Sequence, residues 1–185
     1  MAEKKRPLRK PKDLRDAAAH VDYEIEMLAY SGEELAGGHS SPMVTPAGDK
    51  KNMALESFLL HFRNLRAFLC PSLQPVCIDD ICASDFLDEP KERDLGDAKA
   101  LSLDKQRLNK MLAHLSYSRN NYIRAGDHRW KTASMFTIAV EQMRGFLDLI
   151  SEERRDWFRS TAKIKDYLST ARSLREMANS YPRAD

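Results

Sequence analysis

The sequence predicts an all-α fold, a single-domain bundle of about five helices, and three observations predict it. Apolar residues recur at helical spacing over several long segments. The seven glycines and eight prolines cluster at a few breaks, which favours long helices over many short strands. No alternating pattern typical of a strand continues beyond four residues. A chain of 185 residues is also long enough to bury one sizeable core.

Prolines and glycines set the expected helix boundaries. The first helix follows Pro11, and a long loop at 32–49 separates it from the second, which ends before Pro71. We expect a mobile basic arm at 1–11 and one helical-bundle domain at 12–180. Five main helices and one short extra helix, the third in chain order, are expected at 12–31, 50–70, 78–88, 100–121, 128–151 and 152–169, the last with a tail towards 179.

Two of these helices carry apolar stripes that neighbouring helices must cover, which favours a bundle. A stripe that contains methionines is typical of core packing. The stripe of the segment 128–151 consists of Met135, Ala139, Met143, Phe146 and Ile150. The stripe of the segment 100–121 consists of Leu101, Leu108, Met111, Leu112 and Leu115.

Charge and cysteine content indicate the compartment. The net charge of +2 is too balanced to indicate nucleic-acid binding by itself, although the N-terminal arm is rich in Lys and Arg. That arm is either a solvated terminus or a phosphate-contacting segment. No apolar run approaches the ~20 residues of a membrane span, and three cysteines without a signal peptide favour reduced thiols. We expect a cytoplasmic protein with no membrane partner.

The sequence predicts no metal site and no cofactor. The cysteines, at 70, 77 and 82, lack the spacing of a zinc knuckle. Signatures of hydrolases, P-loops and dinucleotide-binding turns are absent. A cluster of aspartates is explained by a solvated helix face and an N-cap, or by a divalent-cation site; it comprises Asp79, Asp80, Asp85 and Asp88.

The stretch LESFLLHFRNL, residues 55–65, carries a line of polar side chains inside a mostly apolar helix. Ser57, His61 and Asn64 lie at i, i+4 and i+7 and must find hydrogen-bond partners if they are buried. The line is an interhelical hydrogen-bond line, a dimer contact or a binding pocket, and all three interpretations remain open.

The segment RLNKMLAH carries a second candidate site. In an α-helix the seven-residue spacing puts Arg107 and His114 about 20° apart, with Ser118 bordering the same flank. A neutral histidine can take a proton from a ribose 2′-hydroxyl, and an arginine can stabilise the phosphate as charge develops. The alternative is a surface pair or a hydrogen-bonded pair. Arg15 and His20 repeat the type of spacing on the first helix.

An arginine followed at this distance by a histidine, on a helical bundle, resembles the HEPN superfamily of bacterial defence and toxin ribonucleases. The resemblance implies metal-independent RNA cleavage in a homodimer, with His114 as general base and Arg107 as phosphate clamp in a composite cleft. Leu108 departs from the family's usual polar residue after the arginine. The stretches LESFLLHFRNLRAFL, DDICASDF and LAHLSYSR, within 55–120, are also similar to uncharacterised bacterial helical proteins.

Two functional hypotheses follow. The first is a HEPN-like, RNA-directed protein, and the second is a non-catalytic interaction or dimerisation module. A basic and aromatic cluster between the segments 100–121 and 128–151 either holds single-stranded RNA or anchors the turn by stacking. It comprises Arg119, Tyr122, Arg124, His128, Arg129, Trp130 and Lys131.

Overall fold

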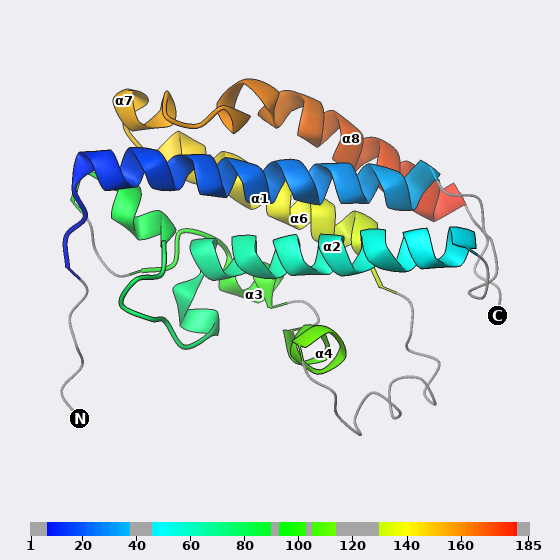
Figure 1. Cartoon of the computed structure of the whole chain (residues 1–185). Helices are drawn as coiled ribbons and strands as arrows, with labels where there is room; N and C mark the ends of the chain where they lie inside the picture. The colour runs from blue at the N-terminus through cyan, green and yellow to red at the C-terminus, as the bar shows by residue number, and fades with distance from the viewer. Residues whose placement is uncertain (1–6, 38–45, 90–92, 103–104, 114–129, 181–185) are drawn as a thin grey trace.

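The computed structural model of the chain describes residues 7–37, 46–89, 93–102, 105–113 and 130–180. Every regular element in these ranges is helical, which confirms the all-α prediction. Helices α1 and α8 run in one direction and α2 and α6 in the opposite direction (Figure 1). No described helix combines the length and the apolar character needed to cross a bilayer. The four long helices are α1 (Pro11–Gly37), α2 (Pro46–Leu69), α6 (Thr132–Leu149) and α8 (Ser160–Ser180).

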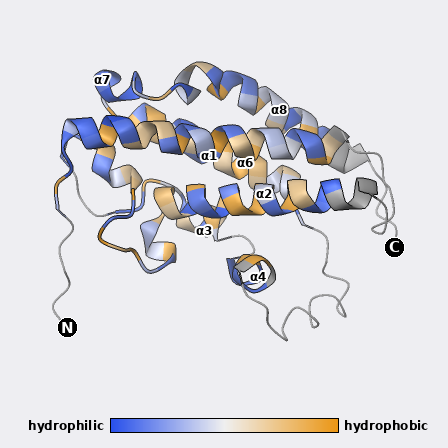
Figure 2. Ribbon diagram, in the orientation of Figure 1, coloured by the Kyte–Doolittle hydropathy of each residue, from blue (hydrophilic) through white to orange (hydrophobic). Residues whose placement is uncertain are grey.

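The core lies between these four helices. Helix α1 packs against the other three, and α6 also packs against α2 and α8. In Figure 2 the ribbon of α6, which lies behind α1 and α2 in this view, is coloured largely as hydrophobic. The predicted stripe of α6 is confirmed, since all five of its side chains, from Met135 to Ile150, are buried. From α2 the core receives Phe58, Leu59, Phe62, Leu65 and Leu69.

Four phenylalanines close one end of the core. Phe68, Phe86, Phe146 and Phe158 pack mostly edge to face, with ring centroids 5.1 to 6.0 Å apart. Phe86 belongs to a single 3₁₀ turn, η2 (Ala83–Phe86). The predicted helix at 78–88 is therefore wrong in extent. A short turn is enough to insert Phe86 into the cluster.

The third predicted long helix is also wrong, because the described part of 100–121 is broken. The chain forms two single turns, α3 (Ala98–Leu101) and α4 (Lys105–Leu108), and then a π-helical turn, η3 (Asn109–Ala113). Just upstream, the chain docks against the end of α2. The backbone N–H groups of Leu95 and Gly96 both donate to the carbonyl oxygen of Leu69, at 2.9 and 3.1 Å. A Cβ on Gly96 would lie 2.7 Å from Leu101, so only glycine permits this close docking.

The ends of the other elements also differ from the predictions. Because α1 continues to Gly37 and α2 begins at Pro46, the predicted loop at 32–49 is shorter. The predicted helix at 152–169 is interrupted: α7 (Glu152–Arg155) ends, and α8 starts at Ser160. Phe158 lies between them and is buried in the aromatic cluster. The chain leaves the helical path there to bury this ring.

Asp22 of α1 caps the new helix across the bundle. Its Oδ2 accepts a hydrogen bond from the backbone N–H of Arg159 at 2.7 Å, and its Oδ1 accepts one from that of Ser160 at 3.0 Å. The Asp22 side chain is 0% exposed. A carboxylate at a helix N-terminus satisfies free N–H groups and interacts favourably with the helix dipole. A residue 137 positions away thus supplies the cap of α8.

We expect Asp22→Ala to lower the free energy of unfolding by about 2–4 kcal/mol, because two N–H groups lose a charged acceptor. The measurement is urea denaturation followed by circular dichroism. Asp16→Ala, at an exposed position of the same helix, is the matched control and should change stability by less than about 0.5 kcal/mol. Equal midpoints for Asp22→Ala and the unsubstituted chain would contradict the capping role.

Candidate functional site

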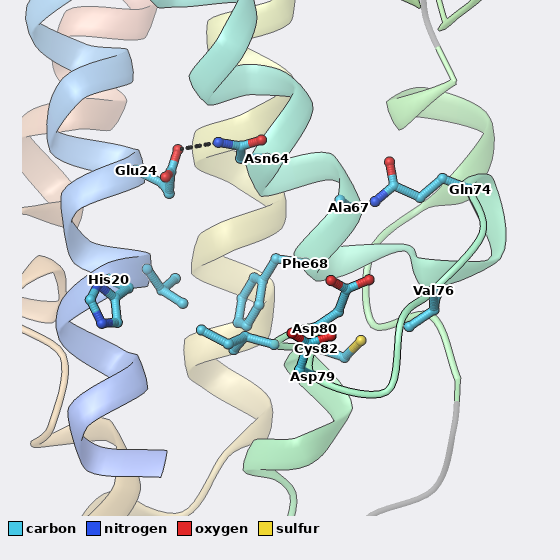
Figure 3. A pocket seen from close by; sticks show the side chains of 12 residues that line it. His20, Glu24, Asn64, Ala67, Phe68, Gln74, Val76, Asp79, Asp80 and Cys82 are labelled. Carbon is cyan, nitrogen blue, oxygen red and sulfur yellow. Dashed lines mark hydrogen bonds between the residues drawn. The ribbon is translucent and has the colours of Figure 1, made fainter. Parts of the chain in front are cut away.

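A pocket of about 350 Å³ opens between α1, the end of α2 and the segment 74–82. We call it the polar pocket. Figure 3 shows His20 and Glu24 on α1 facing Asn64 and Phe68 on α2, with the 74–82 segment closing the other side. Its lining residues are His20, Val21, Glu24, Asn64, Ala67, Phe68, Gln74, Val76, Asp79, Asp80, Ile81 and Cys82.

The predicted polar line of α2 faces α1. The Nδ1 atom of His61 lies 2.7 Å from Glu24 Oε2, and Asn64 Nδ2 donates to the same oxygen at 3.1 Å. Ser57 Oγ donates to Ser31 Oγ at 3.5 Å. A carboxylate only accepts, so the bond to Glu24 places the proton of His61 on Nδ1. Within one chain these contacts form an interhelical hydrogen-bond line, and of its three members only Asn64 reaches the pocket.

A second pocket, of about 320 Å³, adjoins the first along α1. We call it the acidic pocket. The two share His20, Asp79, Asp80 and Ile81, and among the described residues Arg9 is the one Lys or Arg that lines either of them. This surface favours cationic ligands and repels phosphate groups. It is therefore a poor surface for RNA. The carboxylates of the acidic pocket belong to Asp13, Asp16, Asp79, Asp80 and Asp85.

Among the residues that the structure describes, one group has donors close enough to hold a metal ion. The ligand atoms of Cys77, Asp79 and Asp80 lie within 4.8 Å of one another. Asp80 Oδ2 already accepts a hydrogen bond from the backbone N–H of Cys77 at 2.7 Å. The sequence predicts no metal site at the cysteines, and Cys77 is the one cysteine that belongs to this group.

Cys70 is buried and donates a hydrogen bond to the Gly96 carbonyl oxygen at 3.1 Å. Burial raises the pKa of its thiol to about 11.

Arg107 lies in α4 and is 4% exposed. Its guanidinium carbon lies 3.9 Å from the centroid of the Trp130 ring, which is a cation–π contact. The predicted basic and aromatic cluster thus contributes a stacking partner, Trp130, to the arginine of the Arg–His pair. The other two residues predicted for this site, His114 and Ser118, lie outside the described residues.

The π-helical turn η3 occupies five of the six positions between Arg107 and His114, and Leu108 of α4 is the sixth. A π turn contains more residues per turn than an α-helix. The projection of about 20° between Arg107 and His114 assumed ideal α-geometry, so it does not hold over this segment. Sequence patterns gave no signal for the π turn.

The second Arg–His spacing does not form a shared site. Arg15 lies over the ring of Trp157, with 5.4 Å from its guanidinium carbon to the centroid, and it lines neither pocket. His20 is exposed and lines both pockets. The residue that sequence reasoning missed is Glu24. The feature of the sequence that could have identified Glu24 is its position four residues after His20, which places both side chains on the same side of α1.

We expect Glu24→Ala to lower the free energy of unfolding by about 1–3 kcal/mol, because His61 and Asn64 lose their common acceptor. Glu24→Gln keeps one acceptor oxygen and should recover part of this loss. Urea denaturation of both variants is the measurement, with His20→Ala as the matched control on the exposed side of α1. If His20→Ala costs as much as Glu24→Ala, the hydrogen-bond line does not stabilise the α1–α2 pair.

The polar pocket and the segment that contains Arg107 present different side chains. The polar pocket offers carboxylates, a histidine and an amide, whereas the segment 105–113 offers an arginine held by an indole. The resemblance to HEPN proteins stays a prediction. Comparison of this chain with protein-family models, with curated proteins and with solved structures found no match.

Proposed function

We propose that the chain is a HEPN-like, RNA-directed protein that cleaves RNA without a metal ion. The observation that carries the proposal is the π-helical turn at Asn109–Ala113, which is separated from Arg107 by one residue, Leu108, and ends directly before His114. Well under 1% of residues in globular proteins adopt π-helical structure, and π turns are frequent at functional sites. A rare backbone feature thus occupies the interval between the two residues that the mechanism needs.

The proposed reaction uses two side chains. His114 takes the proton of a ribose 2′-hydroxyl and the 2′-oxygen attacks the adjacent phosphorus. The bond from phosphorus to the 5′-oxygen breaks, and the leaving 5′-oxygen takes a proton from water to become a hydroxyl. Arg107 stabilises the charge that builds on the phosphate oxygens. Stacking on Trp130 supports this role, because it holds the guanidinium in place before the substrate binds. Shielding from water also strengthens the interaction between the guanidinium and a phosphate.

We expect the full chain to cleave a single-stranded RNA in the presence of a chelator and to leave 2′,3′-cyclic phosphate ends. His114→Ala should reduce the rate about 10²–10⁴-fold, because it removes the general base. Arg107→Lys keeps a charge but loses the planar fork, and it should also slow cleavage. Gel analysis of end-labelled RNA is the measurement.

His20→Ala is the matched control, since it removes the histidine of the other Arg–His spacing and should leave the rate unchanged. Thermal melts of every variant separate loss of chemistry from loss of fold. Absence of cleavage by the unsubstituted chain, or equal losses in His20→Ala and His114→Ala, would refute the proposed mechanism.

A second candidate function is a non-catalytic dimerisation module. The observation that favours it is a set of large apolar side chains exposed on the two neighbouring helices α1 and α2. An exposed apolar face is typical of a surface that another protein covers. The exposed side chains are Tyr23, Tyr30, Met53 and Leu60.

We expect the chain to form a homodimer through this face, and Leu60→Asp should raise the dissociation constant at least tenfold by placing a charge in the contact. Sedimentation equilibrium, with metal content read from the same sample, is the measurement. Leu149→Asp is the matched control, because Leu149 is also exposed but lies at the end of α6. A strict monomer would contradict the dimerisation module and the composite cleft alike.

A further inference from the structure

Arg66 of α2 is a buried cation. It is 1% exposed and is among the largest fully buried side chains in the described part of the chain. Its Nε and Nη1 atoms are buried and have no hydrogen-bond partner among the residues that the structure describes. A guanidinium does not lose its proton in a protein, and an unpaired buried charge is costly. A group with these properties is expected to have an anionic partner.

Arg63 adds a second positive charge beside it. The two residues are three positions apart on one helix, and the Nε of Arg63 is also buried without a hydrogen-bond partner. Burial and the nearby Arg63 charge both lower the pKa of Arg66. Four carboxylates of the described part of the chain, those of Asp22, Glu24, Glu26 and Asp88, form ion pairs with other residues: His61, Arg154, Arg159 and Lys163.

The arginine pair lies on the opposite flank of α2 from the polar line. In helical projection Arg66 is about 140–160° from His61 and Asn64, which face α1 and its carboxylates. One turn after Arg66, Cys70 contacts the docked backbone of Gly96. Helix α2 also packs against η3, on the side where Figure 1 shows α3 and α4. The pair therefore lies on the flank of α2 opposite Glu24 and the polar pocket.

The donors define the class of ligand. Two guanidinium groups present several N–H donors in planar forks, which match the oxygens of a phosphate group. Arg63 is only partly buried, so the site is open to solvent at its end. We propose that Arg63 and Arg66 form a phosphate-binding site. Free phosphate and an RNA phosphodiester share this chemistry. The binding of an RNA phosphodiester depends on the proposed RNA-directed function, whereas the binding of free phosphate does not.

The test is titration of the full chain with inorganic phosphate at constant ionic strength, with chloride as the reference salt. The probe is the set of arginine Nε–Hε signals in ¹H–¹⁵N spectra, together with thermal melts. We expect the signals of Arg63 and Arg66 to shift and the melting temperature to rise. Arg66→Met should weaken phosphate binding at least tenfold. Without phosphate it should melt no lower than the unsubstituted chain, because it removes an unpaired buried charge.

Arg144→Gln, at an exposed position of α6, is the matched control and should keep full binding. Arg63→Gln should also weaken binding, and it replaces Arg66→Met if that variant does not fold. A second arm titrates a short single-stranded RNA. Shifts with RNA alone identify a phosphodiester as the ligand, and shifts with inorganic phosphate identify free phosphate.

No shift of either arginine signal in either arm overturns the proposal, as does full binding by Arg66→Met. Failure of the proposed ribonuclease function would give a different result from failure of the phosphate site. A chain that binds phosphate through Arg63 and Arg66 but cleaves no RNA retains this site and loses only the ribonuclease mechanism. His114→Ala should bind inorganic phosphate as the unsubstituted chain does.

Discussion

The carboxylate of Asp22 is the interaction on which the arrangement of the bundle depends. It joins the first long helix to the start of the last one through two backbone N–H groups. The segment that precedes this cap carries Phe158 into the cluster that closes the core. Burial of the ring and capping of α8 therefore require the same path of the chain. A buried charge is tolerated here because donors meet both of its oxygens.

The two flanks of α2 have opposite chemistry. On one flank, His61 and Asn64 meet the carboxylate of Glu24, so the polar groups of the α1–α2 contact are paired. On the other flank, Arg63 and Arg66 have buried nitrogen atoms without partners. Polar groups that are hydrogen-bonded fix the register of a helix pair. Buried cations without hydrogen-bond partners favour the binding of an anion. Carboxylates gather around the pockets beside α1.

Sequence patterns could predict the long helices, because apolar periodicity reflects burial directly. The buried stripe of α6 is the clearest case. Patterns could not predict the break before α8, because it depends on a tertiary contact, the burial of Phe158 in the aromatic cluster. They also gave no signal for the end of α3 at Leu101 or for the π turn η3. The partner of the polar line was also hidden, since Glu24 lies 37 residues before His61. Arg66 gave no signal, because a lone arginine in an apolar pattern normally points to solvent.

The two tryptophans of the chain share one feature, since each lies beneath an arginine. The fluorescence of Trp130 therefore depends on the position of Arg107, and that of Trp157 depends on the position of Arg15 of α1. A guanidinium above an indole changes the electric field that the excited ring experiences. The intrinsic fluorescence of the chain therefore contains two built-in reporters of arginine position. Replacing Trp157 by phenylalanine would leave Trp130 as the one tryptophan, so that movement of Arg107 relative to the indole could be followed by tryptophan fluorescence.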